Sequence, residues 1–167
     1  VLVGGAGRAR LSTKEIFLQL LRSPKSFQVA VICGSNAQLQ AELSAISAPS
    51  PHPVKILGYV DNMELWMTAA SALVYKTGGP SMAEAVVKRL PIVFVDVHPG
   101  HEQKNLEYLT SHGLGQYARI PREAVFMVEQ VLEGKIKTNW DRIEKSIINP
   151  QGREDLVALI DRLAPAP

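Results

Sequence analysis

The stretch that decides the fold reads Leu73-Val74-Tyr75-Lys76-Thr77-Gly78-Gly79-Pro80-Ser81-Met82-Ala83-Glu84-Ala85-Val86-Val87. It opens on a short apolar run without polar alternation, which is typical of a strand buried on both faces of a sheet. Glycine, proline and serine then form a turn, and residues 81–88 have helical spacing. A buried strand that turns directly into a helix is the repeating unit of a parallel α/β sheet.

The same alternation continues along the chain as far as about residue 120. Apolar, β-branched runs predict strands within 1–3, 27–33, 54–57, 72–75 and 91–95. Helical spacing predicts helices at 12–21, 36–46, 63–70, 81–88 and 102–111. We therefore predict an α/β fold with a doubly wound, Rossmann-like parallel sheet, whose ligands bind at the carboxyl ends of the strands.

The strand pattern stops in the last part of the chain. Pro121 begins a predicted helix, and two more are predicted near 140–148 and 154–163. The Ala-Pro ending is unable to continue a helix. We expect one domain over residues 1–164 and a frayed tail at 165–167.

Composition excludes several classes of protein. Lys+Arg 18 against Asp+Glu 16 leaves a net charge of +2, so the chain lacks the general basic footprint of a nucleic-acid-binding protein. The single cysteine, Cys33, excludes an internal disulfide and a cysteine-rich metal site. No apolar run approaches the roughly 20 residues needed to cross a bilayer. Because Val1 lies inside a predicted strand with no initiator methionine, we expect a fragment of a longer protein.

Glycines follow the first predicted strand, in the run Gly4-Gly5-Ala6-Gly7. Glycines let a backbone approach a ligand closely, and free amides in such a turn favour an anion. The spacing matches neither the dinucleotide fingerprint nor the P-loop. An ordinary tight turn and a phosphate site at Gly5 and Gly7 are both open at this point.

The turn from Gly78 to Glu84 leads from a strand into a helix. First-turn amides have no partner inside the helix, so a diphosphate suits the site, and Ser81 adds a hydroxyl. Glu84, one turn further, is placed to accept hydrogen bonds from the two hydroxyls of a ribose. The alternative is an ordinary turn, with Glu84 as a partner of the helix dipole.

A dense polar run, His98-Pro99-Gly100-His101-Glu102-Gln103-Lys104-Asn105, follows the strand within 91–95. Paired donors and acceptors of this kind suit a polyhydroxylated ligand, because an unpaired buried hydroxyl is costly. The alternative is the polar start of an exposed helix. The two histidines lack further ligands, so we expect no zinc.

Taken in order, these motifs resemble the C-terminal domain of family 28 glycosyltransferases, which have the GT-B fold. The similarity is greatest to monogalactosyldiacylglycerol synthases and diacylglycerol glucosyltransferases, and less to the lipid I N-acetylglucosaminyltransferase. It rests on Gly4-Gly5-x-Gly7, Val31-Ile32-Cys33-Gly34-x-Asn36, Gly58-Tyr59-Val60-Asp61-Asn62-Met63-x-x-Trp66-Met67, Lys76-x-Gly78-x-x-Ser81-x-Ala83-Glu84-Ala85, Leu90-Pro91-Ile92, Pro99-Gly100-His101-Glu102-x-x-Asn105 and Gly113-x-Gly115.

The resemblance implies roles for residues at matching positions. The Val60 backbone would read the uracil edge, and Glu84 would hold the ribose diol. The residues implied for the diphosphate are Gly78, Gly79 and Ser81, and those implied for the donor sugar are His101, Glu102 and Gln103, with Asn105 orienting the loop. Two positions depart from the family pattern: His101 replaces a glutamine, which bears on the identity of the sugar, and Gly-Pro-Gly-Thr is here Gly78-Gly79-Pro80-Ser81.

The resemblance also implies a function. We expect the donor-binding half of a UDP-sugar-dependent hexosyltransferase with a lipid acceptor such as diacylglycerol, needing no cofactor and no metal. Catalytic residues are expected in an absent N-terminal acceptor domain or partner subunit. That half would bring the protein to the membrane surface, so we expect a cytoplasmic or peripheral membrane location. The alternatives are a soluble subunit of a split N-acetylglucosaminyltransferase and a fragment of a UDP-sugar epimerase with the GT-B fold.

Overall fold

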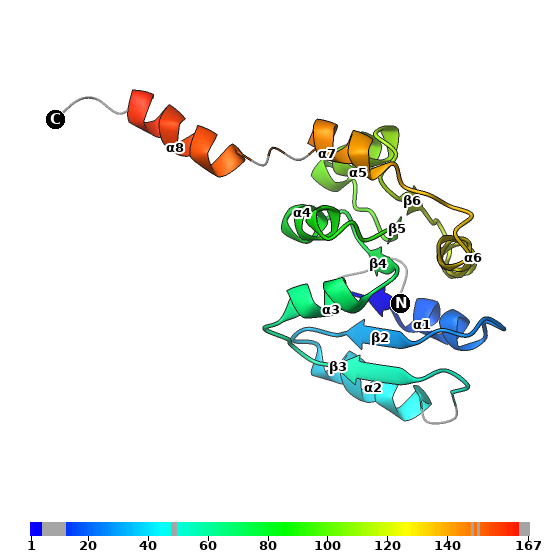
Figure 1. Cartoon of the computed structure of the whole chain (residues 1–167). Coiled ribbons are helices and arrows are strands. Elements are labelled where there is room, and N and C mark those ends of the chain that lie inside the picture. The colour runs from blue at the N-terminus through cyan, green and yellow to red at the C-terminus, as the bar shows by residue number, and fades with distance from the viewer. Residues whose placement is uncertain (5–12, 48–49, 148, 150, 164–167) are drawn as a thin grey trace.

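The computed structural model describes residues 1–4, 13–47, 50–147, 149 and 151–163. Among them a parallel sheet of six strands runs in the order β3-β2-β1-β4-β5-β6 (Figure 1). The strands are β1 (Leu2–Val3), β2 (Val29–Ile32), β3 (Val54–Leu57), β4 (Leu73–Tyr75), β5 (Ile92–Phe94) and β6 (Gln116–Tyr117). The predicted doubly wound α/β sheet is therefore confirmed.

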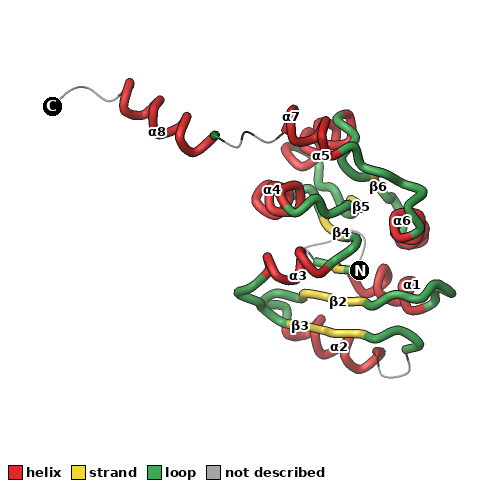
Figure 2. Tube along the Cα trace, in the orientation of Figure 1, coloured by secondary structure: helices red, strands yellow, loops and turns green. Residues whose placement is uncertain are grey.

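Helices connect the strands and continue after the last one (Figure 2). They are α1 (Thr13–Leu21), α2 (Ala37–Ser47), α3 (Met63–Ala69), α4 (Gly79–Val87), α5 (His101–Ser111), α6 (Pro121–Leu132), α7 (Trp140–Ile147) and α8 (Gly152–Leu163). Helix α4 begins two residues before the expected Ser81, because a proline is tolerated in the first turn. The predicted turn thus contributes Gly79 to the helix itself.

Strands β1 to β5 supply side chains to two separate hydrophobic layers. Successive residues of a strand point to opposite faces, so Leu2 packs in one layer and Val3 in the other. Helices α3, α4, α5 and α7 cover the Leu2 face, while α1, α2 and α6 cover the Val3 face. Burial on both faces explains why the strands are continuous apolar runs.

The sixth strand was not predicted from the sequence. It is only two residues long, and Gln116 is exposed, so it carries neither an apolar run nor an alternation. Its place is set by backbone pairing with β5, in the register Val93↔Gln116 and Phe94↔Tyr117.

The last two helices differ in their packing. Helix α7 buries Ile143 completely and is joined to the end of α4 by Arg89, whose guanidinium donates two hydrogen bonds to Glu144, at 2.7 and 3.0 Å. Helix α8 has no buried residue and projects away from the sheet (Figure 1). The predicted tail at 165–167 lies outside the described residues.

Candidate functional site

The carboxyl ends of β1, β4 and β5 lie side by side, because these strands are neighbours in the sheet. Helix α1, which follows β1, covers one face of the sheet, and helix α4, which follows β4, covers the other. The strand order therefore reverses between β1 and β4. In open α/β sheets this switch point is where ligands bind. The segments that leave β4 and β5 there contain two of the three motifs predicted from the sequence.

Gly4, at the end of β1, lies against residues from two other segments. A Cβ at this position would be only 2.8 Å from Cε2 of Tyr75 and 3.9 Å from Cε of Met63, the first residue of α3. The Gly4 amide also donates to the Val74 carbonyl at 3.1 Å. A glycine is required here by this close approach, and it brings the ends of β1 and β4 together with the start of α3.

The amino end of α4 has backbone amides without a side-chain cap. Gly78 is the N-cap residue and has an extended backbone conformation. The helix has no capping hydrogen bond from a side chain at this end. The Ser81 hydroxyl donates to the Tyr75 hydroxyl at 3.2 Å, so Ser81 faces the end of β4. The Lys76 side chain crosses the same turn, with its Cε 3.8 Å from a Cβ placed on Gly78. The first-turn amides, the Ser81 hydroxyl and the Lys76 side chain thus lie along one turn, and such a helix end suits an anion.

A hydrogen-bonded cluster joins this turn to α5 through Glu102. The Glu102 side chain is 8% exposed and accepts from the Lys76 ammonium at 3.3 Å and from the His98 amide at 3.1 Å. The buried Thr77 hydroxyl donates to the Glu102 carbonyl at 2.9 Å. Asn105 Nδ2 donates to the Thr77 carbonyl at 3.2 Å. The two strand-end segments are therefore held together as one polar unit.

The electrostatics of Glu102 follow from its partners. Burial acts to raise the pKa of its carboxyl group, but the His98 amide and the Lys76 ammonium oppose this, and the pKa is lowered from its ordinary value. Glu102 is therefore a carboxylate at neutral pH. Its negative charge is compensated inside the protein.

The backbone bends sharply just after β5. Asp96 is 6% exposed and has a φ of 53°, which is unusual for a residue other than glycine. Its Oδ2 atom lies 4.0 Å from Nε2 of His98, whose side chain is 42% exposed. Strained backbone of this kind clusters at functional sites.

The structure separates the predicted site residues into inward-facing and exposed groups. Asn105 and Ser81 are half-buried and bonded as described above, whereas Glu84 and His101 are exposed on their helices. Gln103 is exposed and donates to Glu107 at 2.8 Å.

The remaining predicted site residues are Val60, Gly5 and Gly7. Val60 follows β3 and packs against the hydrophobic layer on the α3 side. Gly5 and Gly7 lie outside the described residues.

Three residues of this site were given no role from the sequence, although Lys76 belongs to a motif that carries the family resemblance. They are Tyr75, the last residue of β4, and Lys76 and Thr77, which lie in the link between β4 and α4. Thr77 is fully buried although polar, a fact that only the fold reveals. Lys76 has a weak sequence signal, because a lysine directly after a buried strand and two residues before a Gly-Gly turn lies beside a helix amino end.

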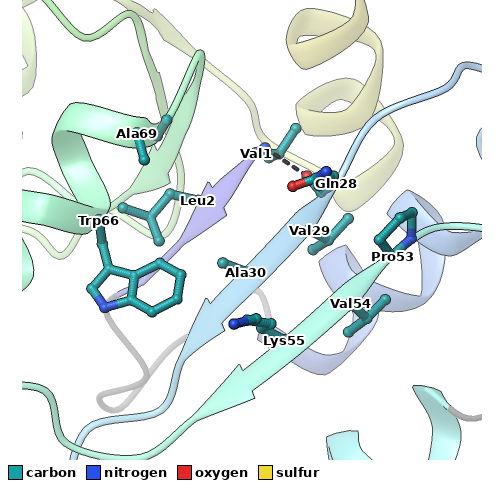
Figure 3. Close-up of a pocket in the computed structure, with 11 residues that line it drawn as sticks. Val1, Leu2, Gln28, Val29, Ala30, Pro53, Val54, Lys55, Trp66 and Ala69 are labelled. Carbon is teal, nitrogen blue, oxygen red and sulfur yellow. Dashed lines mark hydrogen bonds between the residues drawn. The ribbon is translucent and has the colours of Figure 1, made fainter.

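A small cavity of about 180 Å³ between α4 and α5 is lined by Gly79 and Asn105 of this site, whereas two larger cavities lie elsewhere. One of about 530 Å³ is lined by Val1, Gln28 and Pro53, at the amino ends of the strands, and by Trp66 of α3 (Figure 3). It is thus opposite to the candidate site. Another, of about 810 Å³, lies between α5 and β6 and includes Gln103.

The described residues contain neither a metal-binding cluster nor a membrane-spanning helix. No group of three or more His, Cys, Asp or Glu side chains is placed to hold a metal ion. No helix in the same part of the chain has the length and apolar character to cross a membrane.

Comparisons with known proteins show which sequences and folds the chain is similar to. Residues 1–156 match the model of the glycosyltransferase family 28 C-terminal domain. Over 143 residues the chain is 34% identical to monogalactosyldiacylglycerol synthase 2, chloroplastic, of Arabidopsis thaliana, covering 82% of this chain and 29% of that protein. It is 37% identical over 144 residues to processive diacylglycerol beta-glucosyltransferase of Staphylococcus epidermidis, covering 85% and 36%.

A solved structure has the same fold. Acinetobacter baumannii MurG superposes with a TM-score of 0.77 at 16% identity, over 97% of this chain and 49% of that one. The chain thus spans less than half the length of each of these three proteins.

Proposed function

The chain belongs to the family of glycosyltransferase family 28 C-terminal domains, and from that premise we propose that it binds the nucleotide-sugar donor of a UDP-dependent hexosyltransferase. The observation that carries this proposal is the uncapped amino end of α4, with Lys76 across it, at the switch point between β1 and β4. Such a helix end provides free amides and partial positive charge for a diphosphate.

Individual residues take the following parts in this proposal. The diphosphate lies on Gly78, Gly79 and Ser81, at the start of α4. Glu84 is one turn further along the same helix and exposed, so its carboxylate is free to accept the ribose hydroxyls. The Val60 backbone reads uracil, since Met63, three residues later, reaches the end of β1.

The sugar is proposed to lie near the start of α5. His101 is its first residue and is exposed, and Asn105 holds the link before α4 through Thr77. Gln103 is a second proposed sugar contact, although it also faces the cavity beside β6. For Gly5 and Gly7 a diphosphate contact stays a prediction.

The acceptor and the catalytic base belong to the rest of the enzyme in this proposal. Two relatives are named for diacylglycerol or its glycosylated product, which favours a lipid acceptor over a split N-acetylglucosaminyltransferase subunit or an epimerase. An N-terminal acceptor domain or a partner subunit would supply the base and bring the protein to the membrane surface. The donor chemistry proposed here uses no metal, because helix amides and Lys76 stabilise the leaving diphosphate.

Calorimetry with UDP, UDP-glucose, UDP-galactose and UDP-N-acetylglucosamine tests the donor site. The folded chain should bind UDP and at least one UDP-sugar. Replacing Glu84 by alanine should weaken UDP binding by roughly tenfold, since a hydrogen bond to a charged group contributes about 1.5–3 kcal/mol. Glu154→Ala, on the exposed helix α8, is the matched control and should change nothing.

A folded chain that binds none of these nucleotides would refute the proposed function. Equal loss of affinity in the Glu84 and Glu154 variants would refute the role of Glu84 alone. Thermal unfolding gives an independent reading, because a ligand of the folded state raises its stability with concentration.

A further inference from the structure

We propose that Glu102 is a positioning residue, whose buried carboxylate holds the Lys76 ammonium at the amino end of α4 so that this ammonium binds the donor diphosphate. This inference rests on the proposed donor site and deepens it. It differs from the role that the family resemblance implies, in which Glu102 contacts the sugar itself.

The first argument is that both oxygens of the Glu102 carboxylate already accept hydrogen bonds within the protein and that little of the side chain is exposed. Oε1 accepts from Lys76 at 3.3 Å and Oε2 from the His98 amide at 3.1 Å, and the side chain is only 8% exposed. The main chain of Glu102 is also held, by the Thr77 hydroxyl. Each oxygen keeps a second lone pair, but the low exposure of the side chain leaves little access for a sugar hydroxyl.

The second argument is that Lys76 has both the position and the free donors for a phosphate. Its side chain is 34% exposed and lies over Gly78, where the first-turn amides of α4 begin. An ammonium has three hydrogen-bond donors, and the bond to Glu102 uses one. A flexible lysine is costly to order, so a fixed carboxylate that holds it beforehand makes binding more favourable.

The third argument is that the carboxylate connects two segments that must be placed together. Lys76 follows β4 and His98 follows β5, and Asn105 of α5 closes the cluster through the Thr77 carbonyl. Glu102 therefore sets the distance between the start of α4 and the start of α5. These are the proposed diphosphate and sugar ends of the donor.

Binding measurements on the 167-residue chain test this role with UDP and UDP-glucose by calorimetry, and with uridine by ligand-observed NMR. Lys76→Met should weaken UDP binding by roughly tenfold, and Lys76→Arg should recover most of that lost affinity. Glu102→Gln should weaken UDP binding by about fivefold. The double variant should bind UDP no more weakly than Lys76→Met alone, since both substitutions act through one contact. Uridine, which has no phosphate, should bind all of these variants equally.

Lys104→Met, an exposed lysine on α5, is the control and should bind UDP like the wild type. Should Glu102→Gln fail to fold, Glu102→Asp keeps the charge but withdraws it from Lys76, and the same loss for UDP is expected. The inference is wrong if Glu102→Gln weakens the binding of UDP-glucose but leaves the binding of UDP unchanged, because that result indicates a direct sugar contact. It is also wrong if uridine binding falls equally, which indicates a merely structural role. No UDP binding by the wild type would instead refute the donor site as a whole.

Discussion

At the scale of single residues, the site depends on close approaches that small changes disturb. Gly4 and the Tyr75 ring are so near that any side chain at position 4 must move the ring. The Tyr75 hydroxyl in turn accepts the hydrogen bond of Ser81. The end of β1 therefore controls the amino end of α4 without belonging to it.

Replacing Gly4 by alanine should lower both stability and UDP affinity. The new Cβ would lie 2.8 Å from the Tyr75 ring, and overpacking of this kind costs about 1–3 kcal/mol. Urea unfolding measures the loss of stability, and calorimetry the loss of affinity. Gly152→Ala, whose nearest neighbour would be at 3.7 Å, serves as the control. Unchanged stability of the Gly4 variant would mean that Tyr75 has room to move.

Gly115 is a second position where backbone geometry decides the residue. Its φ is +69°, and an added Cβ would lie 2.6 Å from the Ile92 carbonyl oxygen. We expect Gly115→Ala to destabilise the chain by about 1–3 kcal/mol, because a left-handed conformation and a backbone clash combine. Urea unfolding measures it, and a value near zero would contradict the described turn before β6.

At the scale of elements, helices α6 and α7 are fastened to the sheet in different ways. Helix α6 packs on α1, and the loop after α1 adds polar contacts: Ser23 donates to Glu129 at 2.6 Å and Lys25 pairs with Glu133. Helix α7 is anchored by the buried Ile143 and by the Arg89–Glu144 pair. Both attachments therefore combine buried apolar side chains with an ion pair, although α6 and α7 use different partners.

Ile143→Ala should detach α7 or loosen it. The side chain is completely buried, and removal of such a group costs about 2–5 kcal/mol. Ile160→Ala on α8 is the matched control: that side chain is 56% exposed, so its loss should stay within about 0.5 kcal/mol. Urea unfolding compares the two. Equal losses would show that α8 packs on the sheet in solution.

The pH dependence of the α1–α6 contact follows from Glu133. Hydrogen bonds from Lys135 and Lys25 lower the pKa of its carboxyl group from 4.5 to about 2. Since the folded pKa lies below the unfolded one, the stabilisation is complete above about pH 4.5 and is lost as the pH falls towards 2. Glu133→Gln should therefore be less stable than the wild type at pH 7, and the difference should shrink below pH 4.5. A difference independent of pH would contradict this account.

At the scale of the whole molecule, the chain combines the proposed donor site with an exposed terminal helix. The polar cluster around Glu102 lies at the switch point of the sheet, where ligands of open α/β sheets bind. Helix α8 leaves five large apolar side chains exposed. The chain also covers only 29% and 36% of the two relatives compared. The chemistry of transfer is accordingly proposed to need the rest of the enzyme.

The isolated chain should bind UDP but transfer almost no hexose to a lipid acceptor. The proposed base and acceptor groove lie outside it, and binding alone does not supply the attacking group. Incorporation of labelled hexose into diacylglycerol measures transfer, with the full-length enzyme as the positive control. Transfer by the chain at the full-length rate would refute this division of labour.

Much of the fold was readable from the sequence because both faces of the sheet are buried. The run 91–95 contains β5, whose three residues are all buried, since burial on two sides demands a continuous apolar run. Gln116 and Tyr117 gave no such signal, because that strand is only two residues long and Gln116 is exposed. The site was predictable where backbone chemistry decides it, as at Gly78, and much less so where a side-chain partner does.

The sequence by itself determined the class of the fold, the strand ends that bear the site and the family to which the chain belongs. The hydrophobic periodicity and the positions of the glycines are local properties, so they can be read from the sequence alone. Only the tertiary structure decided that Glu102 meets Lys76, that Thr77 is buried, and that Gly4 touches Tyr75. These partners come from different strand ends, and only the packing of one parallel sheet brings them within hydrogen-bond or van der Waals distance.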